Sequence, residues 1–96
     1  MKTPWGESQS VEDIGLGIWF VTTAGHGGYY VPTALVQRIP KEHRAYAKRW
    51  SGDERWYEED CAWAAVALAF PQFFSATAQA HARETVKQFI KPSNIR

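Results

Sequence analysis

Three consecutive carboxylates that run into the single cysteine of the chain have the residue types of a chemical site. Glu58, Glu59 and Asp60 stand in the stretch "WYEEDCAWAAVALAF" at residues 56–70. Carboxylates take part in acid–base chemistry and bind divalent metal ions. Adjacent carboxylates on one turn point in different directions, so a metal would need a further ligand, for which His26 is the best candidate. One hypothesis is therefore a small enzyme or metal-dependent module that uses His26 with these carboxylates.

A structural explanation of the acidic run is simpler. Alanine is frequent in residues 56–70, so the segment predicts one helix with the carboxylates in its first turn. There they would interact favourably with the helix dipole, by roughly 0.3–1 kcal/mol each, and cap free N–H groups. A third explanation is an acidic surface patch that contacts a partner. All three explanations stay open, and the structural one is preferred.

Cys61 has two interpretations as well. A free cysteine is most often a small buried hydrophobic residue. A nucleophilic pair of Cys61 with His26 would require a proximity in the fold that the sequence does not show. Because the chain has one cysteine, an intramolecular disulfide and a zinc cage made of cysteines are excluded, and a reducing compartment is favoured.

The glycine-rich stretch "AGHGG" at residues 24–28 predicts a hairpin turn with His26 at its tip. It lacks the Lys-Ser/Thr of a phosphate-binding loop and the spacing of a dinucleotide-binding motif. Glycines leave a loop backbone accessible to a partner, and Tyr29 and Tyr30 follow directly. The turn is therefore also a candidate contact surface.

The elements that position these residues divide the chain into two halves. The first half predicts an antiparallel sheet: a weaker strand at 9–14, the strongest strand at 17–23, and its partner at 28–32. The pattern in the strongest strand places Ile18 and Phe20 on one face and Trp19 and Val21 on the other. Both faces are partly apolar, so one is expected to pack on helices and the other to be partly covered.

The second half predicts helices. We expect a short helix at 33–39, a polar helix at 40–50, the central helix at 56–70 that ends at Pro71, and a last helix that Ser75 caps. The fold class is therefore α+β, with a small antiparallel sheet in the N-terminal half packed against C-terminal helices. The chain is expected to form one domain, 1–96, that is β-rich over 8–32 and helical over 33–91, with a flexible tail at 92–96.

Two sets of residues complete the predicted core. In the central helix, Trp63, Leu68 and Phe70 are expected to be buried, with Trp19 or Phe20 packed against it. The buried stripe of the last helix is expected to consist of apolar residues at helical spacing: Ala78, Ala82, Val86, Phe89 and Ile90. Arg83, Lys87 and Lys91 fall on another face of that helix.

The net charge of +1 is close to zero, which argues against general binding of nucleic acid. A local basic segment keeps an accessory nucleic-acid-binding role open as an alternative; its residues are Arg38, Lys41, Arg44, Lys48 and Arg49. No apolar stretch follows Lys2, and the longest apolar run, at 61–70, is about half the length that spans a bilayer. We therefore expect a cytosolic protein without membrane contact.

Four segments are spread over most of the chain: "TPWG", "GIWFVTT", "HGG" and "WYEEDCAWAAVALAFP". Together they resemble an uncharacterised small domain of phage, prophage and plasmid proteins, which would act in the host bacterial cytosol. The resemblance implies no established activity. By analogy, a small protein of a mobile element is similar in kind to the inhibitors that phages and plasmids use against bacterial defences, notably anti-CRISPR proteins.

These observations lead us to expect a small inhibitor of a bacterial defence system that binds a host protein complex, such as a CRISPR effector, in a stoichiometric complex. No catalytic residue, bound metal or cofactor is expected. The candidate contact residues are Glu58, Glu59, Asp60, His26, Tyr29, Tyr30, Arg83, Lys87 and Lys91.

Overall fold

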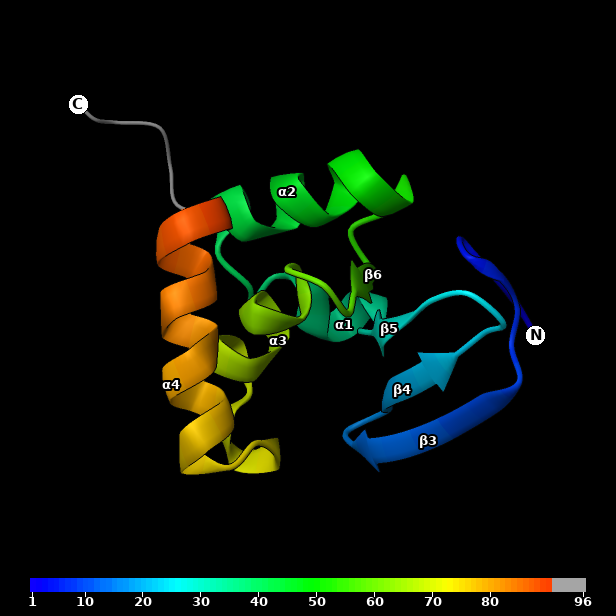
Figure 1. The fold of residues 1–96 in the computed structure, drawn as a ribbon, viewed down its shortest axis with the longest axis horizontal. Helices are drawn as coiled ribbons and strands as arrows, with labels where there is room; N and C mark the ends of the chain where they lie inside the picture. Colours follow the sequence, from blue (N-terminus) through cyan, green and yellow to red (C-terminus); the bar gives the residue numbers. More distant parts are fainter. Residues whose placement is uncertain (91–96) are drawn as a thin grey trace.

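The computed structural model describes residues 1–90 and joins a four-stranded sheet to a group of helices (Figure 1). The chain begins with a small hairpin of β1 (Lys2–Thr3) and β2 (Gly6–Glu7). The sheet consists of β3 (Ser10–Gly15), β4 (Ile18–Thr22), β5 (Gly27–Tyr30) and β6 (Trp56–Glu58). Its strands are all antiparallel and lie in the order β3-β4-β5-β6. The sheet prediction for the first half is confirmed, including the weaker strand.

Four α-helices follow or interrupt the sheet. They are α1 (Thr33–Val36), α2 (Lys41–Ser51), α3 (Trp63–Ala69) and α4 (Ala76–Thr85). A 3-10 turn at Pro71–Phe73 joins α3 to α4, and a π-helical turn at Val86–Ile90 extends α4. The α+β class is confirmed. Within residues 1–90, no helix is both long enough and apolar enough to cross a membrane.

The prediction of a single helix at 56–70 is wrong for the first part of this segment. Residues 56–58 form the edge strand β6, residues 59–62 form turns, and the helix begins at Trp63. Trp56 pairs with Tyr30 and Tyr57 pairs with Tyr29, so aromatic cross-strand contacts outweigh the helix propensity of the alanines that follow.

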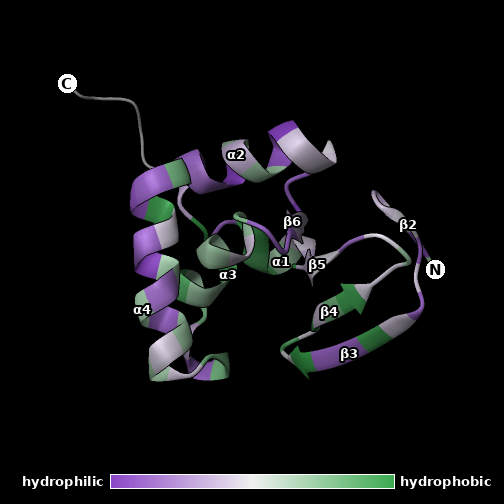
Figure 2. Cartoon of the chain, viewed as in Figure 1, coloured by the Kyte–Doolittle hydropathy of each residue, from purple (hydrophilic) through white to green (hydrophobic). Residues whose placement is uncertain are grey.

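One face of the sheet packs against the helices, as the alternation in β4 predicts. Ile18 on β4 and Tyr57 on β6 are fully buried there, in one cluster with Val31, Val66 and Phe70. The other face carries a row of aromatic rings. Figure 2 shows hydrophobic colouring over β4 and mixed colouring along β3, which lies at the exposed edge of the sheet.

Helix α3 lies at the centre of the helical layer, as expected, but small residues contribute most of its buried surface. Phe70, which ends it, is fully buried, whereas Trp63 and Leu68 are only half-buried, contrary to the prediction. Ala64 and Ala67 are the fully buried residues that face α4. Their small side chains let the two helices approach closely, which leaves the larger side chains at the periphery.

The last helix begins as predicted, because the Ser75 hydroxyl accepts the N–H of Ala78 at 3.0 Å. Ala82 and Ile90 are buried, but Phe89 is 57% exposed, so its place in the predicted stripe is wrong. The π-helical turn widens the helix at Val86–Ile90 and thus shifts the angular position of the last residues. Lys91 and the predicted tail at 92–96 lie outside the described residues.

Candidate functional site

Three motifs that are far apart in sequence meet beside the β6 edge of the sheet. The turn between β1 and β2, the turn before β5 and the segment after β6 surround one pocket of about 370 Å³, whose fourth side is α2. We call it the acidic–aromatic pocket. Its lining residues are Trp5, His26, Tyr46, Trp50, Glu58, Asp60 and Cys61. The predicted candidates His26, Glu58 and Asp60 therefore come together.

The indole of Trp5 forms one wall of the pocket because Gly28 leaves room for it. A Cβ at Gly28 would lie 2.5 Å from the Trp5 ring and 2.5 Å from the carbonyl oxygen of Tyr57. No side chain fits between them, so glycine lets the indole lie directly on the sheet. The Trp5 ring also meets Trp56 edge-on, with 5.5 Å between the ring centroids. The glycine of the "HGG" motif thus positions the tryptophan of the "TPWG" motif.

Gly27 makes the corresponding contact with the acidic run. Its carbonyl oxygen accepts the N–H of Glu59 at 2.9 Å, and a Cβ at Gly27 would lie 3.1 Å from Glu59 Oε1. The turn itself is closed by Thr23, whose hydroxyl donates to the carbonyl of His26 at 2.8 Å and accepts the N–H of His26 at 3.1 Å. These bonds hold the exposed His26 at the border of the pocket.

Glu58 has a structural role in the turn after β6. Its carboxylate accepts backbone N–H groups of Asp60 at 2.7 Å, Cys61 at 3.0 Å and Ala62 at 2.8 Å. Such charge-assisted bonds are stronger than neutral ones, so the Glu58 side chain organises the approach to α3. The capping expected of the acidic run is thus performed by one of its three residues, in the turns that precede the helix.

Glu59 and Asp60 differ from Glu58 because both are exposed. Within residues 1–90, ion pairs join three other carboxylates to cations and none involves the acidic run. Asp60 therefore adds negative charge to the lining of the pocket, whereas Glu59 lies beside Gly27 and is not among the lining residues.

Tyr46 and Trp50, one helical turn apart on α2, form the aromatic wall opposite Trp5. Their ring centroids lie 6.4 Å apart, and Trp50 is 62% exposed. Burial first of all, with contributions from the neighbouring Cys61 and Glu58 side chains, raises the pKa of Tyr46 to about 12. The ionised form of the Tyr46 hydroxyl is therefore even less favoured than in an ordinary tyrosine.

Sequence reasoning missed Trp5, Tyr46 and Trp50 as site residues. Two signals were present: the tryptophan of the "TPWG" motif, and two aromatic residues at i and i+4 on an otherwise polar helix. Neither signal indicates which distant motif the rings would face, because this depends on how the hairpin and α2 pack against β6.

The two tyrosines after the "HGG" turn lie in aromatic packing, and neither lines the pocket. Tyr29 faces the helices and contacts Phe20 and Phe74, with centroid distances of 4.9 and 5.5 Å. Tyr30 lies on the opposite face between Trp19 and Trp56, at 5.1 and 5.0 Å. Both are half-buried.

The basic candidates lie elsewhere on the molecule. Arg83 and Lys87 are exposed on α4 and its extension, at the end of the molecule away from the β1–β2 hairpin (Figure 1). In the basic segment 38–49, two arginines have structural contacts. The Arg38 guanidinium lies 4.9 Å from the centre of the Phe70 ring, and Arg44 Nε donates to the Ile39 carbonyl at 3.0 Å.

A metal site is not assembled in the described part of the chain. No three His, Cys, Asp or Glu side chains of residues 1–90 are grouped so that they would hold a metal ion. His26 and Cys61 both line the pocket, yet no hydrogen bond joins their side chains among the described residues. The arrangement offers aromatic surfaces and negative charge, which are suited to binding.

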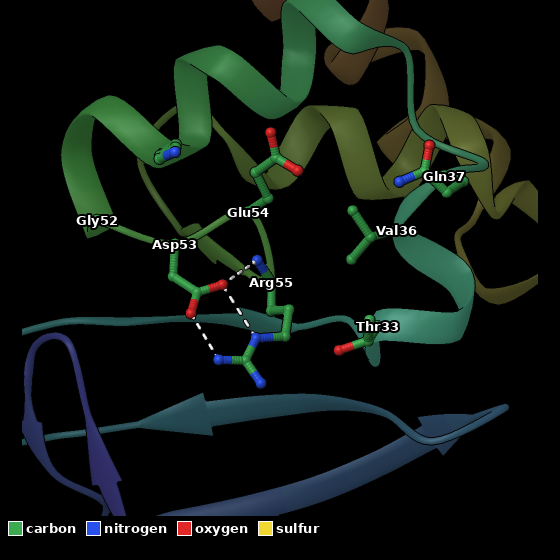
Figure 3. A pocket seen from close by; sticks show the side chains of 8 residues that line it. Thr33, Val36, Gln37, Gly52, Asp53, Glu54 and Arg55 are labelled. Atoms are coloured by element: carbon green, nitrogen blue, oxygen red, sulfur yellow. Dashed lines mark hydrogen bonds and ion pairs between the residues drawn. The ribbon is translucent and has the colours of Figure 1, made fainter.

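A second depression, of about 410 Å³, lies between α1, the end of α2 and the loop before β6 (Figure 3). We call it the polar cleft. Its lining residues are Thr33, Val36, Gln37, Lys48, Gly52, Asp53, Glu54 and Arg55. Asp53 and Arg55 form a two-pronged pair in it, at 3.0 Å (Nε to Oδ1) and 2.6 Å (Nη2 to Oδ2). The hydrogen bonds and charge of Arg55 lower the pKa of the Asp53 carboxyl.

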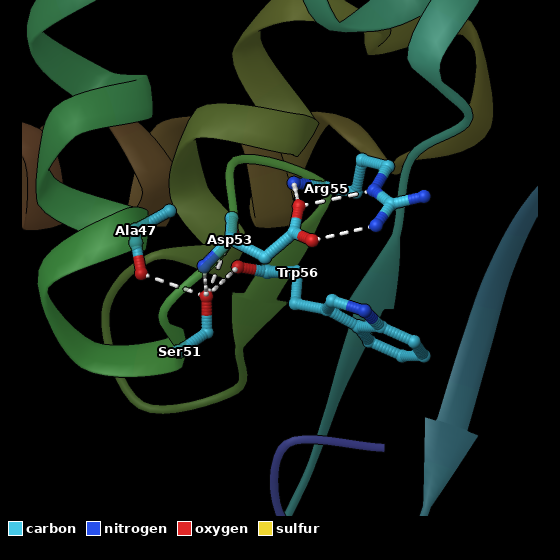
Figure 4. Close-up of polar contacts among 5 residues, drawn as sticks. All are labelled: Ala47, Ser51, Asp53, Arg55 and Trp56. Atoms are coloured by element: carbon cyan, nitrogen blue, oxygen red, sulfur yellow. Dashed lines mark hydrogen bonds and ion pairs between the residues drawn. The ribbon is translucent and has the colours of Figure 1, made fainter. Parts of the chain in front are cut away.

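The loop beside the polar cleft is fixed by Ser51 (Figure 4). The Ser51 hydroxyl lies 3.0 Å from the carbonyl oxygen of Ala47, 2.8 Å from that of Asp53 and 3.1 Å from that of Trp56. It also accepts the N–H of Asp53 at 3.2 Å. One side chain thus connects the end of α2 to the start of β6.

The fold and this site define a small α+β domain with one pocket at which three of its sequence motifs meet. A family model described as "Domain of unknown function (DUF7007)" matches residues 1–93, so the chain belongs to this family. No curated protein and no solved structure matches the chain. The resemblance to an uncharacterised small domain is thereby confirmed at the level of the family.

Proposed function

We propose that the domain functions by binding another protein in a stoichiometric complex, with the acidic–aromatic pocket and its rim as the contact surface. The observation that carries this proposal is the meeting of the "TPWG", "HGG" and "WYEEDC" motifs around one pocket. Exposed Trp50 and the exposed acids Glu59 and Asp60 give this surface the aromatic anchors and the charge that protein interfaces use.

Binding suits the individual groups better than catalysis does. The Glu58 carboxylate is occupied by backbone N–H groups, and the raised pKa of Tyr46 disfavours the ionised form of its hydroxyl. A general base needs a group that is available to accept a proton from a substrate. Of the remaining groups, Asp60 and the indoles of Trp5 and Trp50 act through charge and surface. The side chains of His26 and Cys61 also line the pocket, but no hydrogen bond joins them into a nucleophile–base pair within residues 1–90.

The partner that we propose is a nucleic-acid-binding complex of a bacterial defence system, such as a CRISPR effector. Two features support it. The chain resembles domains of phage, prophage and plasmid proteins, and its acidic rim offers negative charges that resemble nucleic-acid phosphates to a basic groove. Complementary charge speeds the association of such surfaces and guides their docking.

Affinity capture from bacterial lysate with charge-reversed variants tests this proposal. Glu58 is unsuitable because its reversal would remove the bonds of the turn. Glu59→Lys with Asp60→Lys is suitable, since both side chains are exposed. The matched control is Arg83→Glu with Lys87→Glu on α4, which moves the charge by the same amount in the opposite direction.

We call the variant with Glu59→Lys and Asp60→Lys the acidic-rim variant. We expect it to lose the proteins that the wild type captures, and we expect the α4 variant to retain them. Circular dichroism of both variants should match the wild type. Retention of all captured proteins by the acidic-rim variant, with loss only in the α4 variant, would contradict the proposal.

A further inference from the structure

We propose that the acidic–aromatic pocket takes an arginine side chain of the partner. This inference rests on the proposed function and names the group that enters the pocket. The guanidinium would lie between the aromatic walls with Asp60 as its counter-ion, and the aliphatic stem would contact the indoles.

The charge of the pocket supports a cation. Its seven lining residues include Glu58 and Asp60 but no lysine or arginine. Among residues 1–90, none of these acids forms an ion pair. A cationic side chain from another molecule would neutralise the charge of these carboxylates, because the lining itself has no lysine or arginine.

The aromatic walls support a flat cation in particular. Trp5, Tyr46 and Trp50 present ring surfaces on two sides of the pocket, and rings attract cations that lie over their faces. The same molecule already shows this contact twice: the guanidinium carbon of Arg49 lies 5.9 Å from the Tyr46 ring centre, and Arg38 covers Phe70. Arg49 is not among the lining residues, so it leaves the pocket unfilled.

Arginine fits the hydrogen-bonding groups better than lysine. The Glu58 oxygens already accept three backbone N–H groups, so Asp60 is the carboxylate with capacity for a two-pronged contact. The planar fork of a guanidinium matches both oxygens of a carboxylate and stacks on aromatic rings, whereas an ammonium is a strongly hydrated point charge.

A titration with small arginine analogues, followed by NMR of the ¹⁵N-labelled domain, tests the inference without any partner. The probes are N-acetyl-arginine amide and N-acetyl-citrulline amide, which have nearly the same shape but differ in charge. We expect saturable shifts of the Trp5 and Trp50 indole N–H signals with the arginine probe. Its affinity should exceed that of the citrulline probe by about fivefold, from one exposed ion pair and one cation–π contact.

Asp60→Asn is the matched variant, because it keeps the size of an exposed side chain and removes its charge. It should reduce the affinity for the arginine probe toward that for the citrulline probe but leave a smaller preference, because the cation–π contact remains, in a protein whose other amide signals are unchanged. Equal affinity of the wild type for both probes would overturn the inference. Absence of saturable shifts at the two indoles, or saturable shifts centred on Lys48 and Arg55, would do so too.

This test separates the inference from the proposed function. If the acidic-rim variant loses its captured proteins but the arginine probe does not bind, the pocket has another occupant and the contact surface stands. If the arginine probe binds as expected but the acidic-rim variant keeps all its captured proteins, the arginine site stands and the proposed contact surface is wrong.

Discussion

The two depressions of this domain have similar volumes, about 410 Å³ for the polar cleft and about 370 Å³ for the acidic–aromatic pocket, but opposite charge organisation. In the polar cleft, Asp53 is paired with Arg55, and Glu54 is paired with Arg44 at 3.7 Å. In the acidic–aromatic pocket, Asp60 has no such partner among residues 1–90. Paired charges stabilise the chain that carries them, whereas an unpaired carboxylate beside exposed aromatic rings is available to another molecule. The polar cleft therefore contributes to the stability of the fold, and our proposal assigns binding to the acidic–aromatic pocket.

The largest loss of stability is expected from Gly28→Ala, which displaces the Trp5 indole from the wall of the acidic–aromatic pocket. The new Cβ would meet the Trp5 ring at 2.5 Å and the backbone of Tyr57 at 2.5 Å, so the sheet must shift. Overpacking of this kind costs about 1–3 kcal/mol, which chemical denaturation would measure. Gly25→Ala is the control, because a Cβ there meets nothing within 4 Å and should leave stability within about 0.5 kcal/mol of the wild type. Equal stability of the two variants would show that Trp5 does not lie on Gly28.

A similar but smaller loss is expected on the side of the polar cleft from Ser51→Ala. The variant removes the hydroxyl that connects Ala47, Asp53 and Trp56, and leaves the N–H of Asp53 without its acceptor. One unsatisfied group costs about 1–3 kcal/mol when buried, and this site is only half-buried, so we expect about 1 kcal/mol by denaturation. Binding by the acidic–aromatic pocket should be unchanged in this variant. A loss of binding without a loss of stability would contradict the separation of the two regions.

The Asp53–Arg55 pair of the polar cleft should make the stability of the domain depend on pH. Because Arg55 lowers the pKa of the Asp53 carboxyl in the folded state, the pair stabilises the fold above the ordinary pKa of an aspartate. This contribution is lost as the pH falls through the lowered pKa. Asp53→Asn should therefore reduce stability at neutral pH and flatten its decrease below about pH 4, the ordinary value for this carboxyl. Denaturation curves at several pH values would show this, and an unchanged acid limb in Asp53→Asn would refute it.

The smallest effect on stability is expected from Trp50→Ala, which should have the largest effect on binding. The side chain is 62% exposed at the end of α2, so its removal should change the free energy of unfolding by less than about 0.5 kcal/mol. Aromatic residues of this kind are frequent binding hot spots, so affinity capture should be lost. A Trp50→Ala variant that is destabilised but still captures the same proteins would show that Trp50 contributes to stability and not to binding.

The parts of the fold that follow from local pattern could be predicted. Strand β4 is rich in β-branched and aromatic residues, and Ser75 marks the start of α4. Strand β6 could not be predicted, because Trp56 becomes a strand residue only by pairing with Tyr30, which lies far away in the sequence. The alanines that follow favour helix locally, and only pairing at the edge of the sheet makes residues 56–58 a strand. The position of Phe89 was missed because a π-helical turn leaves no clear signal in the spacing.

The candidate site, like the fold, could be predicted only in part. The acidic residues and His26 could be singled out by type, and Glu58, Asp60 and His26 do meet around one pocket. Glu59 is not among its lining residues. The sequence did not indicate that Glu58 would be used internally while Asp60 remained accessible, because this depends on the turn that Glu58 itself forms. Trp5 was missed because its place is set by the space above Gly28.

The central claim is that a partner protein binds at the acidic–aromatic pocket and not at the polar cleft. The most direct measurement is photo-cross-linking in bacterial cells, with p-benzoylphenylalanine replacing either His26 or Gln37. Both residues are exposed, and each lines one of the two depressions. We predict a cross-linked protein adduct from position 26 and none from position 37, and the position 26 adduct should disappear when Asp60→Lys is added. An adduct from position 37 alone, or none from either position, would contradict the account.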